Sequence, residues 1–408
     1  MVRVGLALVA VLSAASVAMD EEDGMNSNVF AYLEQEAAPV MPQLAWNASD
    51  ATEHETWRLT FRAKLVELLG RWPARVPLAV HWDEDDVLET DGFTRRKVYI
   101  RSEEHYWVPA YYYIPKGLEG KAPAMVCFHG HSGIMPYIRE GTEAERDKGR
   151  AHALDYAAYF AEHGYISLAV VQRGWNETRN ETPHSCHRVT MDSFLLGMTP
   201  VGLRTWDAMR VIDFLLTQDE VDPERIGTAG LSGGGTTALF LAAREPRIQL
   251  AMIAGYFCTF RDSIFTIHHC ICNCVPGIMQ WGEMSDVAAL FAPRPMLIIS
   301  GDEDRIFPID ATKRAYAELE TTYAVLGAEE RDQVDLGMLH KDIDRGDQFA
   351  VHAGRIGDEA DPLAPDPLEV FFEEDFIAES DLHFSDRLGS FFTGIIPGSP
   401  SRFRPCLL

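Results

Sequence analysis

Residues 225–241 read RIGTAGLSGGGTTALFL, and this stretch decides how the rest of the chain is interpreted. An apolar strand (225–229) runs into a Gly-x-Ser-x-Gly turn around Ser232, and a helix begins at about 236. A serine on such a strand–turn–helix bend has a strained backbone, and glycines must flank it because neighbouring chain passes close. The alternatives are a plain glycine-rich turn or a phosphate loop, and the phosphate loop is disfavoured because no lysine follows the glycines. We therefore predict that Ser232 is a nucleophile.

Apolar strands and helices alternate on both sides of this turn. A helix is expected at 52–69, and antiparallel strands at 97–101 and 108–114. Further strands are expected at 124–128, 165–171, 250–254 and 296–300, with helices at 151–163, 203–216 and 311–326. This alternation predicts an α/β fold with a mostly parallel central sheet and helices on both faces.

A serine nucleophile needs a base and an acid, here expected in the order serine, acid, histidine. The loop after strand 296–300 reads GDEDRIFP (301–308) and offers three acids, Asp302, Glu303 and Asp304. Each could instead be a solvated carboxylate or a helix cap. The spacing from Gly301 favours Asp304 as the residue that orients the base.

The catalytic base and the oxyanion hole complete the predicted catalytic site. His340, His352 and His383 lie downstream of the acid. His340 has the more usual short distance from it, whereas His383 precedes a predicted terminal helix (387–395). An oxyanion hole needs two backbone N–H groups. We expect them from Gly233 and from His131, in the loop HGHSG (129–133), for which an ordinary glycine turn is the alternative.

Seven cysteines leave at least one thiol outside any intramolecular disulfide. Cys127 lies in an apolar strand and should be buried. Residues 268–274 read HHCICNC, but the Cys-x-Cys spacing is not that of the usual structural zinc sites. We interpret this run as a loop at the wall of a substrate pocket that can hold one disulfide, and we predict no metal.

The first 18 residues have the basic start, short apolar run and small residues of a secretory signal peptide, with cleavage expected after Ala18. An uncleaved anchor is the alternative. An acidic leader (19–50) follows, and a hydrolase domain is expected over 51–408, with an acidic insertion at 341–381. Sequons at Asn47, Asn176 and Asn180 agree with a secreted, extracellular glycoprotein. The formal charge of −26 disfavours nucleic acid and anionic membranes as partners.

Several motifs together carry a family resemblance from about Trp57 to the end of the chain. They are HGHSG (129–133), QRG (172–174), VDPERIG (221–227), the turn around Ser232 and APRP (292–295). The chain resembles the α/β hydrolases of the acetyl xylan esterase, dienelactone hydrolase and prolyl oligopeptidase-like clan, in a branch with a short helical N-terminal extension. The resemblance implies the α/β-hydrolase fold.

The same resemblance implies roles for individual residues. Ser232 would be the nucleophile, Asp304 the triad acid, and Gly233 with His131 the oxyanion donors. Relatives have a Gly-Gly-His-like turn followed by a Phe-rich closing helix. His383, followed by Phe391 and Phe392, resembles that ending best, so we prefer His383 to its rival His340, although the glycines of the turn are missing here.

These expectations together describe a carboxylesterase-type serine hydrolase that works through an acyl-enzyme and needs no cofactor. The substrate would be an acetylated carbohydrate or another small extracellular ester, and the mature protein would have no membrane span. The oligomeric state stays open. Two alternative functions remain. One is a prolyl oligopeptidase-like serine peptidase, although fewer than 100 residues precede the first expected strands, too few for the β-propeller of that class. The other is an inactive binding protein of the same fold.

Overall fold

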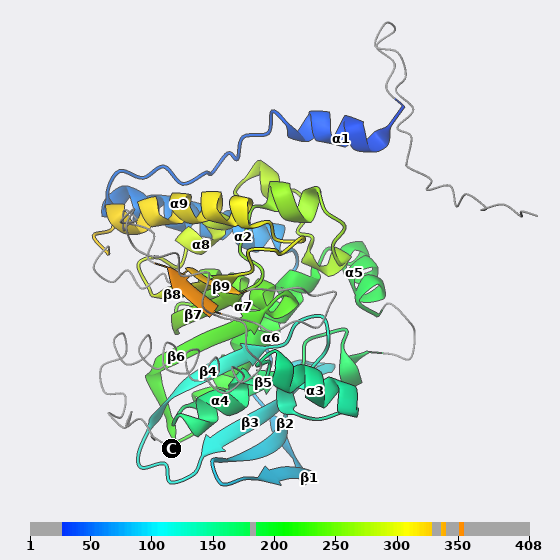
Figure 1. Cartoon of the computed structure of the whole chain (residues 1–408), viewed down its shortest axis with the longest axis vertical. Helices are drawn as coiled ribbons and strands as arrows, with labels where there is room; N and C mark the ends of the chain where they lie inside the picture. The colour runs from blue at the N-terminus through cyan, green and yellow to red at the C-terminus, as the bar shows by residue number, and fades with distance from the viewer. Residues whose placement is uncertain (1–26, 180–184, 329–335, 340–350, 355–408) are drawn as a thin grey trace, which may run out of the picture. The chain divides into compact units, whose positions relative to one another are not determined.

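The computed structural model describes residues 27–179, 185–328, 336–339 and 351–354. The chain divides into two compact units, residues 1–41 and 42–408. The described part of the first contains helix α1 (Val29–Ala37) (Figure 1). It begins after Asn28, whose side-chain oxygen accepts hydrogen bonds from the N–H groups of Phe30 and Ala31. Among the described residues, no helix has both the length and the apolar character needed to cross a membrane.

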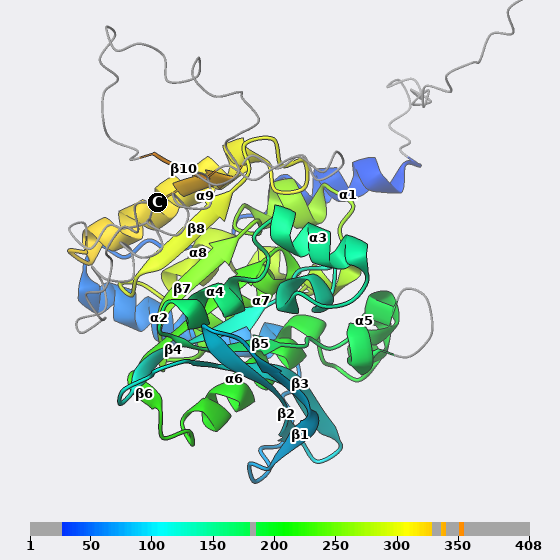
Figure 2. The same cartoon turned by 60° about the horizontal axis from the view of Figure 1, so that its bottom comes forward.

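The second unit contains one sheet, in which ten described strands follow the order β1-β2-β3-β5-β4-β6-β7-β8-β9-β10 (Figures 1 and 2). Neighbours from β5 to β9 are parallel, and the pairs β1–β2, β2–β3, β3–β5 and β9–β10 are antiparallel. The predicted mostly parallel sheet is confirmed. The strands are β1 (Val80–Glu89), β2 (Phe93–Glu103), β3 (Tyr106–Pro115), β4 (Ala122–Phe128), β5 (Ile166–Val170), β6 (Val221–Leu231), β7 (Ile248–Ala254), β8 (Met296–Ser300), β9 (Leu336–Leu339) and β10 (Val351–Gly354).

Alternate residues of the central strands feed two separate apolar clusters. Val126 and Phe128 belong to the larger cluster, whereas Met125 and Cys127 belong to the other. Because successive side chains of a strand point to opposite faces, the sheet is covered on both sides. Helices α2 (Ala51–Leu68), α6 (Pro200–Leu215), α7 (Gly233–Arg244), α8 (Met284–Ala289) and α9 (Ile309–Val325) contribute to the larger cluster, and α4 (Tyr156–Glu162) contributes to the smaller one (Figure 2).

One predicted helix is wrong in its extent. The segment 151–163 was expected to be a single helix, but α3 (Glu143–Ala151) ends where that helix should begin, and α4 starts only at Tyr156. Ala153 between them has a φ of 45°, which a helix cannot continue. The buried Leu154 belongs to the smaller cluster, so the chain turns inward there instead of extending one helix.

Several predictions concern residues that lie outside the described ones. They are the signal segment 1–18, the sequon at Asn180, the histidines His340 and His383, the helix expected at 387–395, and the acidic segment 341–381 apart from β10.

Candidate functional site

Ser232 stands on the turn that joins β6 to α7. Its backbone angles are φ 56° and ψ −119°, and its N–H donates to the carbonyl of Ala254 at 2.8 Å. Such angles cost a residue with a Cβ about 1–3 kcal/mol, so the surrounding structure must impose them. The chain packs closely around the flanking glycines. A Cβ on Gly230 would lie 2.1 Å from the carbonyl oxygen of Gly234, and a Cβ on Gly234 would lie 1.9 Å from the carbonyl oxygen of Phe128. The turn therefore has the strand–strained residue–helix form that its sequence predicted.

The loop after β4 lies directly against this turn. A Cβ on Gly130 would be 3.4 Å from Ser232 Cβ and 2.8 Å from Tyr137 Oη, which accepts a hydrogen bond from Gly130 N at 2.8 Å. Trp175 Nε1 donates to the carbonyl oxygen of His131 at 3.2 Å, which holds the loop from the other side. A Cβ on Gly233 would lie 2.7 Å from His131 Cε1, so the two predicted oxyanion residues lie together beside Ser232.

A buried histidine fixes the base of the same loop. His129 Nε2 accepts a hydrogen bond from Gln172 N at 3.0 Å, so its proton lies on Nδ1 and is donated to the carbonyl of Gly130 at 2.8 Å. Burial lowers the pKa of His129 to about 3, so the ring is neutral. The Gln172 side chain donates to the carbonyl of His129 and accepts from Thr237 Oγ1, both at 2.5 Å. His129 therefore joins the loop to the turn after β5 and to α7.

Asp304 occupies the loop after β8. Of the three acids considered there, Asp304 is buried at 6% exposure, Asp302 is partly exposed and Glu303 is exposed. Asp304 Oδ1 accepts hydrogen bonds from the N–H groups of Ile306 at 2.9 Å and Phe307 at 3.1 Å. Since β4, β6, β7 and β8 are parallel, this loop leaves the same edge of the sheet as Ser232 and the loop of His131.

The described residues also place a histidine near Asp304 that was not among the histidines considered for the base. His269 Nε2 lies 2.9 Å from Ser263 Oγ and 3.1 Å from the carbonyl of Ile306, and its ring centroid is 5.1 Å from that of Phe307. Burial lowers its pKa, and the charge of Asp304 partly opposes that effect. Because Nε2 is occupied by the backbone, His269 serves in this arrangement to pack the acid loop.

The predicted base His383 and its rival His340 lie outside the described residues. His352 is on β10, where its backbone pairs with that of Met338 on β9.

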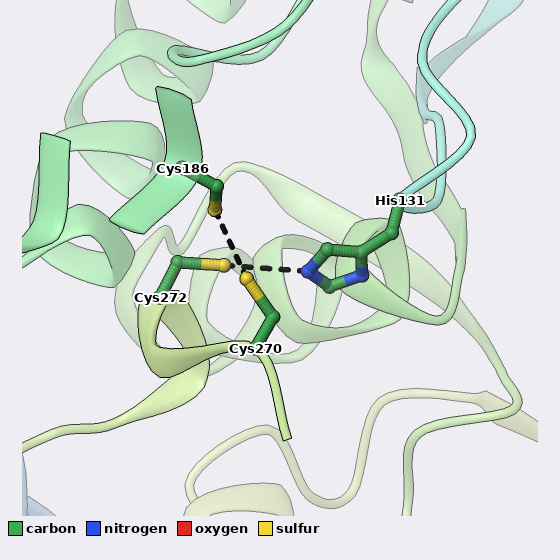
Figure 3. Close-up of side chains that lie close together, drawn as sticks. All are labelled: His131, Cys186, Cys270 and Cys272. Atoms are coloured by element: carbon green, nitrogen blue, oxygen red, sulfur yellow. Dashed lines mark hydrogen bonds between the residues drawn. The ribbon is translucent and has the colours of Figure 1, made fainter. Parts of the chain in front are cut away.

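A second group of reactive side chains meets next to the turn. His131, Cys186, Cys270 and Cys272 have ligand atoms that all lie within 4.8 Å of one another (Figure 3). His131 Nε2 is 3.3 Å from Cys272 Sγ, and the sulfurs of Cys186 and Cys270 are 3.2 Å apart, both as free thiols. We call these four residues the thiol cluster. Cys186 is on α5 (Ser185–Leu195), and Cys272 lies in a short 3-10 turn.

The thiol cluster is electrostatically unusual. Hydrogen bonds from Cys186 and Cys270 hold the pKa of Cys272 well below that of an ordinary thiol. Burial would lower the pKa of His131, but hydrogen bonds to Cys270 and Cys272 raise it to about 9. The cluster therefore favours a thiolate beside an imidazolium.

A buried arginine faces the same cluster. Arg204 has 2% exposure, and its Nη2 lies 3.6 Å from Cys186 Sγ and 3.2 Å from the carbonyl of Arg173. Its guanidinium lies 4.4 Å from the ring centroid of Trp175. Its Nε and Nη1 have no hydrogen-bond partner among the described residues. Neither Arg204 nor Cys186 was expected at the site, because each lies far along the chain from the Cys-x-Cys run.

Two family models match the chain. The acetyl xylan esterase model matches residues 74–269, and the prolyl oligopeptidase family model matches residues 204–336. Both matches include Ser232. The first also includes the loop of His131, and the second includes Asp304.

Individual proteins that are similar to this chain are also described as hydrolases or esterases. "Putative hydrolase YtaP" of Bacillus subtilis (strain 168) is 28% identical over 287 residues, which cover 65% of this chain and 88% of that protein. The solved structure of a "putative acetyl xylan esterase" from Bacteroides fragilis NCTC 9343 has a TM-score of 0.64 at 18% identity, covering 75% of this chain and 81% of the other. Glucuronoyl esterase from Solibacter usitatus has a TM-score of 0.53 at 18% identity, covering 71% and 87%. At these identities the structural likeness concerns the fold.

Proposed function

We propose that the chain is a serine hydrolase that cleaves carboxylic esters, because it matches the acetyl xylan esterase and prolyl oligopeptidase family models and has the α/β-hydrolase fold of the similar esterase structure. The observation that carries the proposal is the backbone of Ser232. A φ of 56° is kept at a cost on a turn whose glycines admit no side chain, and such strain is concentrated at functional sites. A turn with only a structural purpose would be more stable with glycine at this position.

The proposed mechanism assigns one role to each predicted residue. Ser232 Oγ would attack the ester carbonyl while His383 accepts its proton, and Asp304 would orient the histidine. The N–H groups of Gly233 and His131 would stabilise the oxyanion. The alcohol would leave with a proton from the histidine, and water would then release the acid from the acyl-enzyme.

The substrate part of the proposal is an acetylated carbohydrate or a similar small ester outside the cell. It is supported by the esterase names of the similar proteins and by the predicted signal segment. The high negative charge agrees with an uncharged ester in preference to a polyanionic substrate.

A fluorophosphonate probe tests the mechanism in the full-length chain. We expect labelling in the wild type and in His269→Ala, and loss of labelling in Ser232→Ala and His383→Ala. Loss in His340→Ala with retention in His383→Ala would move the base to the rival position. An unlabelled but folded wild type would identify an inactive binding protein instead.

Substrate comparison separates the two enzyme classes. We expect turnover of acetylated xylose and no turnover of a proline-linked amide. Preferential cleavage of the amide would favour the prolyl oligopeptidase-like peptidase, to which the match over residues 204–336 also points.

A further inference from the structure

The thiol cluster has the composition and shape of a structural metal site. One imidazole nitrogen and three sulfurs converge from three separate segments: the loop after β4, the start of α5 and the loop 270–272 (Figure 3). Cys272 is fully buried and the other three are partly buried. We propose that His131, Cys186, Cys270 and Cys272 bind one Zn²⁺ ion.

The distances suit a tetrahedral ion. Bonds of about 2.3 Å to sulfur and about 2.0 Å to nitrogen place neighbouring ligand atoms roughly 3.5–3.8 Å apart. The pair His131 Nε2 and Cys272 Sγ, at 3.3 Å, is close to that separation. Cys186 and Cys270 sulfurs, at 3.2 Å, need to move apart by about half an ångström, and the whole set already lies within 4.8 Å.

Arg204 supplies an independent argument. Three thiolates, one neutral imidazole and a divalent cation carry a net charge of −1, and a fully buried guanidinium faces that charge from 3.6 Å. A buried cation is costly unless an anion compensates it, and Arg204 has two nitrogens without a partner among the described residues. A disulfide between Cys186 and Cys270 would leave Arg204 beside neutral sulfurs and a single remaining thiol. A bound metal therefore explains why all five side chains lie together, whereas a disulfide explains this for only two of them.

The ion would be structural, because four protein ligands leave no open position for substrate or water. On binding, the cluster releases three protons to solvent, two from thiols and one from the imidazolium of His131. The ion would join the loop of His131 to α5 and to the loop 270–272. The next residue, Asn273, accepts a hydrogen bond through Oδ1 from Thr236 Oγ1 of α7 at 3.0 Å. Metal binding of this kind does not depend on the proposed esterase activity.

Metal analysis of the full-length chain, purified under reducing conditions, tests the proposal. We expect about one Zn²⁺ per chain, and after replacement by Co²⁺ we expect the thiolate-to-cobalt charge-transfer absorption. Cys272→Ser should lose both signals. Cys274→Ser is the matched control, since Cys274 lies two residues away but outside the cluster, and it should retain both.

A measurement on the unmodified chain guards against variants that fail to fold. Chelation should lower the melting temperature of the wild type, and added Zn²⁺ should restore it. The proposal is overturned if the wild type takes up neither Zn²⁺ nor Co²⁺, if Cys274→Ser loses the metal as fully as Cys272→Ser, or if mass spectrometry finds a Cys186–Cys270 disulfide in metal-free native protein.

Discussion

The imidazole of His131 occupies the space that a side chain on Gly233 would need. A Cβ added to Gly233 would stand 2.7 Å from Cε1 and 2.8 Å from Nδ1 of that ring. Real Cβ contacts are not so short, so the ring must move if residue 233 gains a side chain. The ring also contacts Cys272, with Nε2 3.3 Å from its Sγ, and Trp175, with ring centroids 5.3 Å apart. The ring of His131 therefore belongs to the thiol cluster and also contacts the predicted oxyanion residue Gly233.

Gly233→Ala should reduce the rate of fluorophosphonate labelling at Ser232 at least tenfold and destabilise the protein by about 1–3 kcal/mol, because the methyl group displaces a held ring. Gly92→Ala is the control, since its methyl group would meet chiefly the flexible side chain of Glu162, at 3.1 Å from Cγ. Urea unfolding and labelling rates check both changes.

The double variant identifies the cause. In a His131→Ala background there is room for the methyl group, so Gly233→Ala should cost less by about 0.5–3 kcal/mol than in the wild type. Equal costs in the two backgrounds would contradict a clash with the ring.

Ser232→Gly and Ser232→Ala should both abolish labelling but differ in stability. Glycine adopts a φ of 56° with little strain, whereas alanine keeps the Cβ that causes it. We expect the glycine variant to be more stable than the alanine variant by about 1–2 kcal/mol, measured by urea unfolding. An alanine variant as stable as the glycine variant would argue against strain at this turn.

Arg173 in the QRG motif should be a major contributor to stability. Its Nε and Nη2 donate to the two carboxylate oxygens of Asp207 at 2.6 and 2.7 Å, it also pairs with Glu103, and its guanidinium lies 3.9 Å from the ring centroid of Tyr106. Asp207 is 4% exposed. Arg173→Met should therefore cost about 3–5 kcal/mol, because it leaves a buried carboxylate without its partner.

The matched control for this ion pair is Arg188→Met. Arg188 pairs with Asp192 at 2.7 Å, but both side chains are at least half exposed. Its loss should change the free energy of unfolding by no more than about 0.5 kcal/mol. Similar costs for the two arginines would mean that burial of the Asp207 pair is not decisive.

Asp286 should make stability depend on pH. It accepts hydrogen bonds from Trp46 N at 2.6 Å and Glu283 N at 2.7 Å, and burial raises its pKa to about 6. The folded state therefore binds its proton more tightly than the unfolded state, in which the pKa is about 3.9. Its favourable contribution is complete below that value and is lost as the pH rises through about 6.

Asp286→Asn removes this titration. The stability of the wild type relative to the asparagine variant should fall by about 2 kcal/mol between pH 4.5 and pH 7.5. Urea unfolding at both pH values measures the difference, and a constant difference would contradict the proposed shift.

Local patterns were enough for the parts of the fold that local forces decide. Four of the five residues at 296–300 are apolar, and β8 has those bounds because a buried parallel strand needs no polar face. The segment VHWDEDDVLE lacks an apolar alternation, so β1 was not predicted. It forms at the sheet edge by pairing with β2, where its acidic residues remain in water. The interruption between α3 and α4 at Ala153 was also not predicted, because it depends on where Leu154 finds apolar neighbours in the folded protein.

For the site, the sequence by itself determined the turn around Ser232, because a strand, a strained residue and close-packed glycines are contiguous in the chain. It also predicted that the acid lies in the loop after β8, where Asp304 is buried and its neighbours Asp302 and Glu303 are more exposed. Only the tertiary structure decided that Cys186, Arg204 and His131 meet Cys270 and Cys272. The physical reason is that folding the sheet brings together loops separated by up to 141 residues, and no local spacing encodes such a meeting.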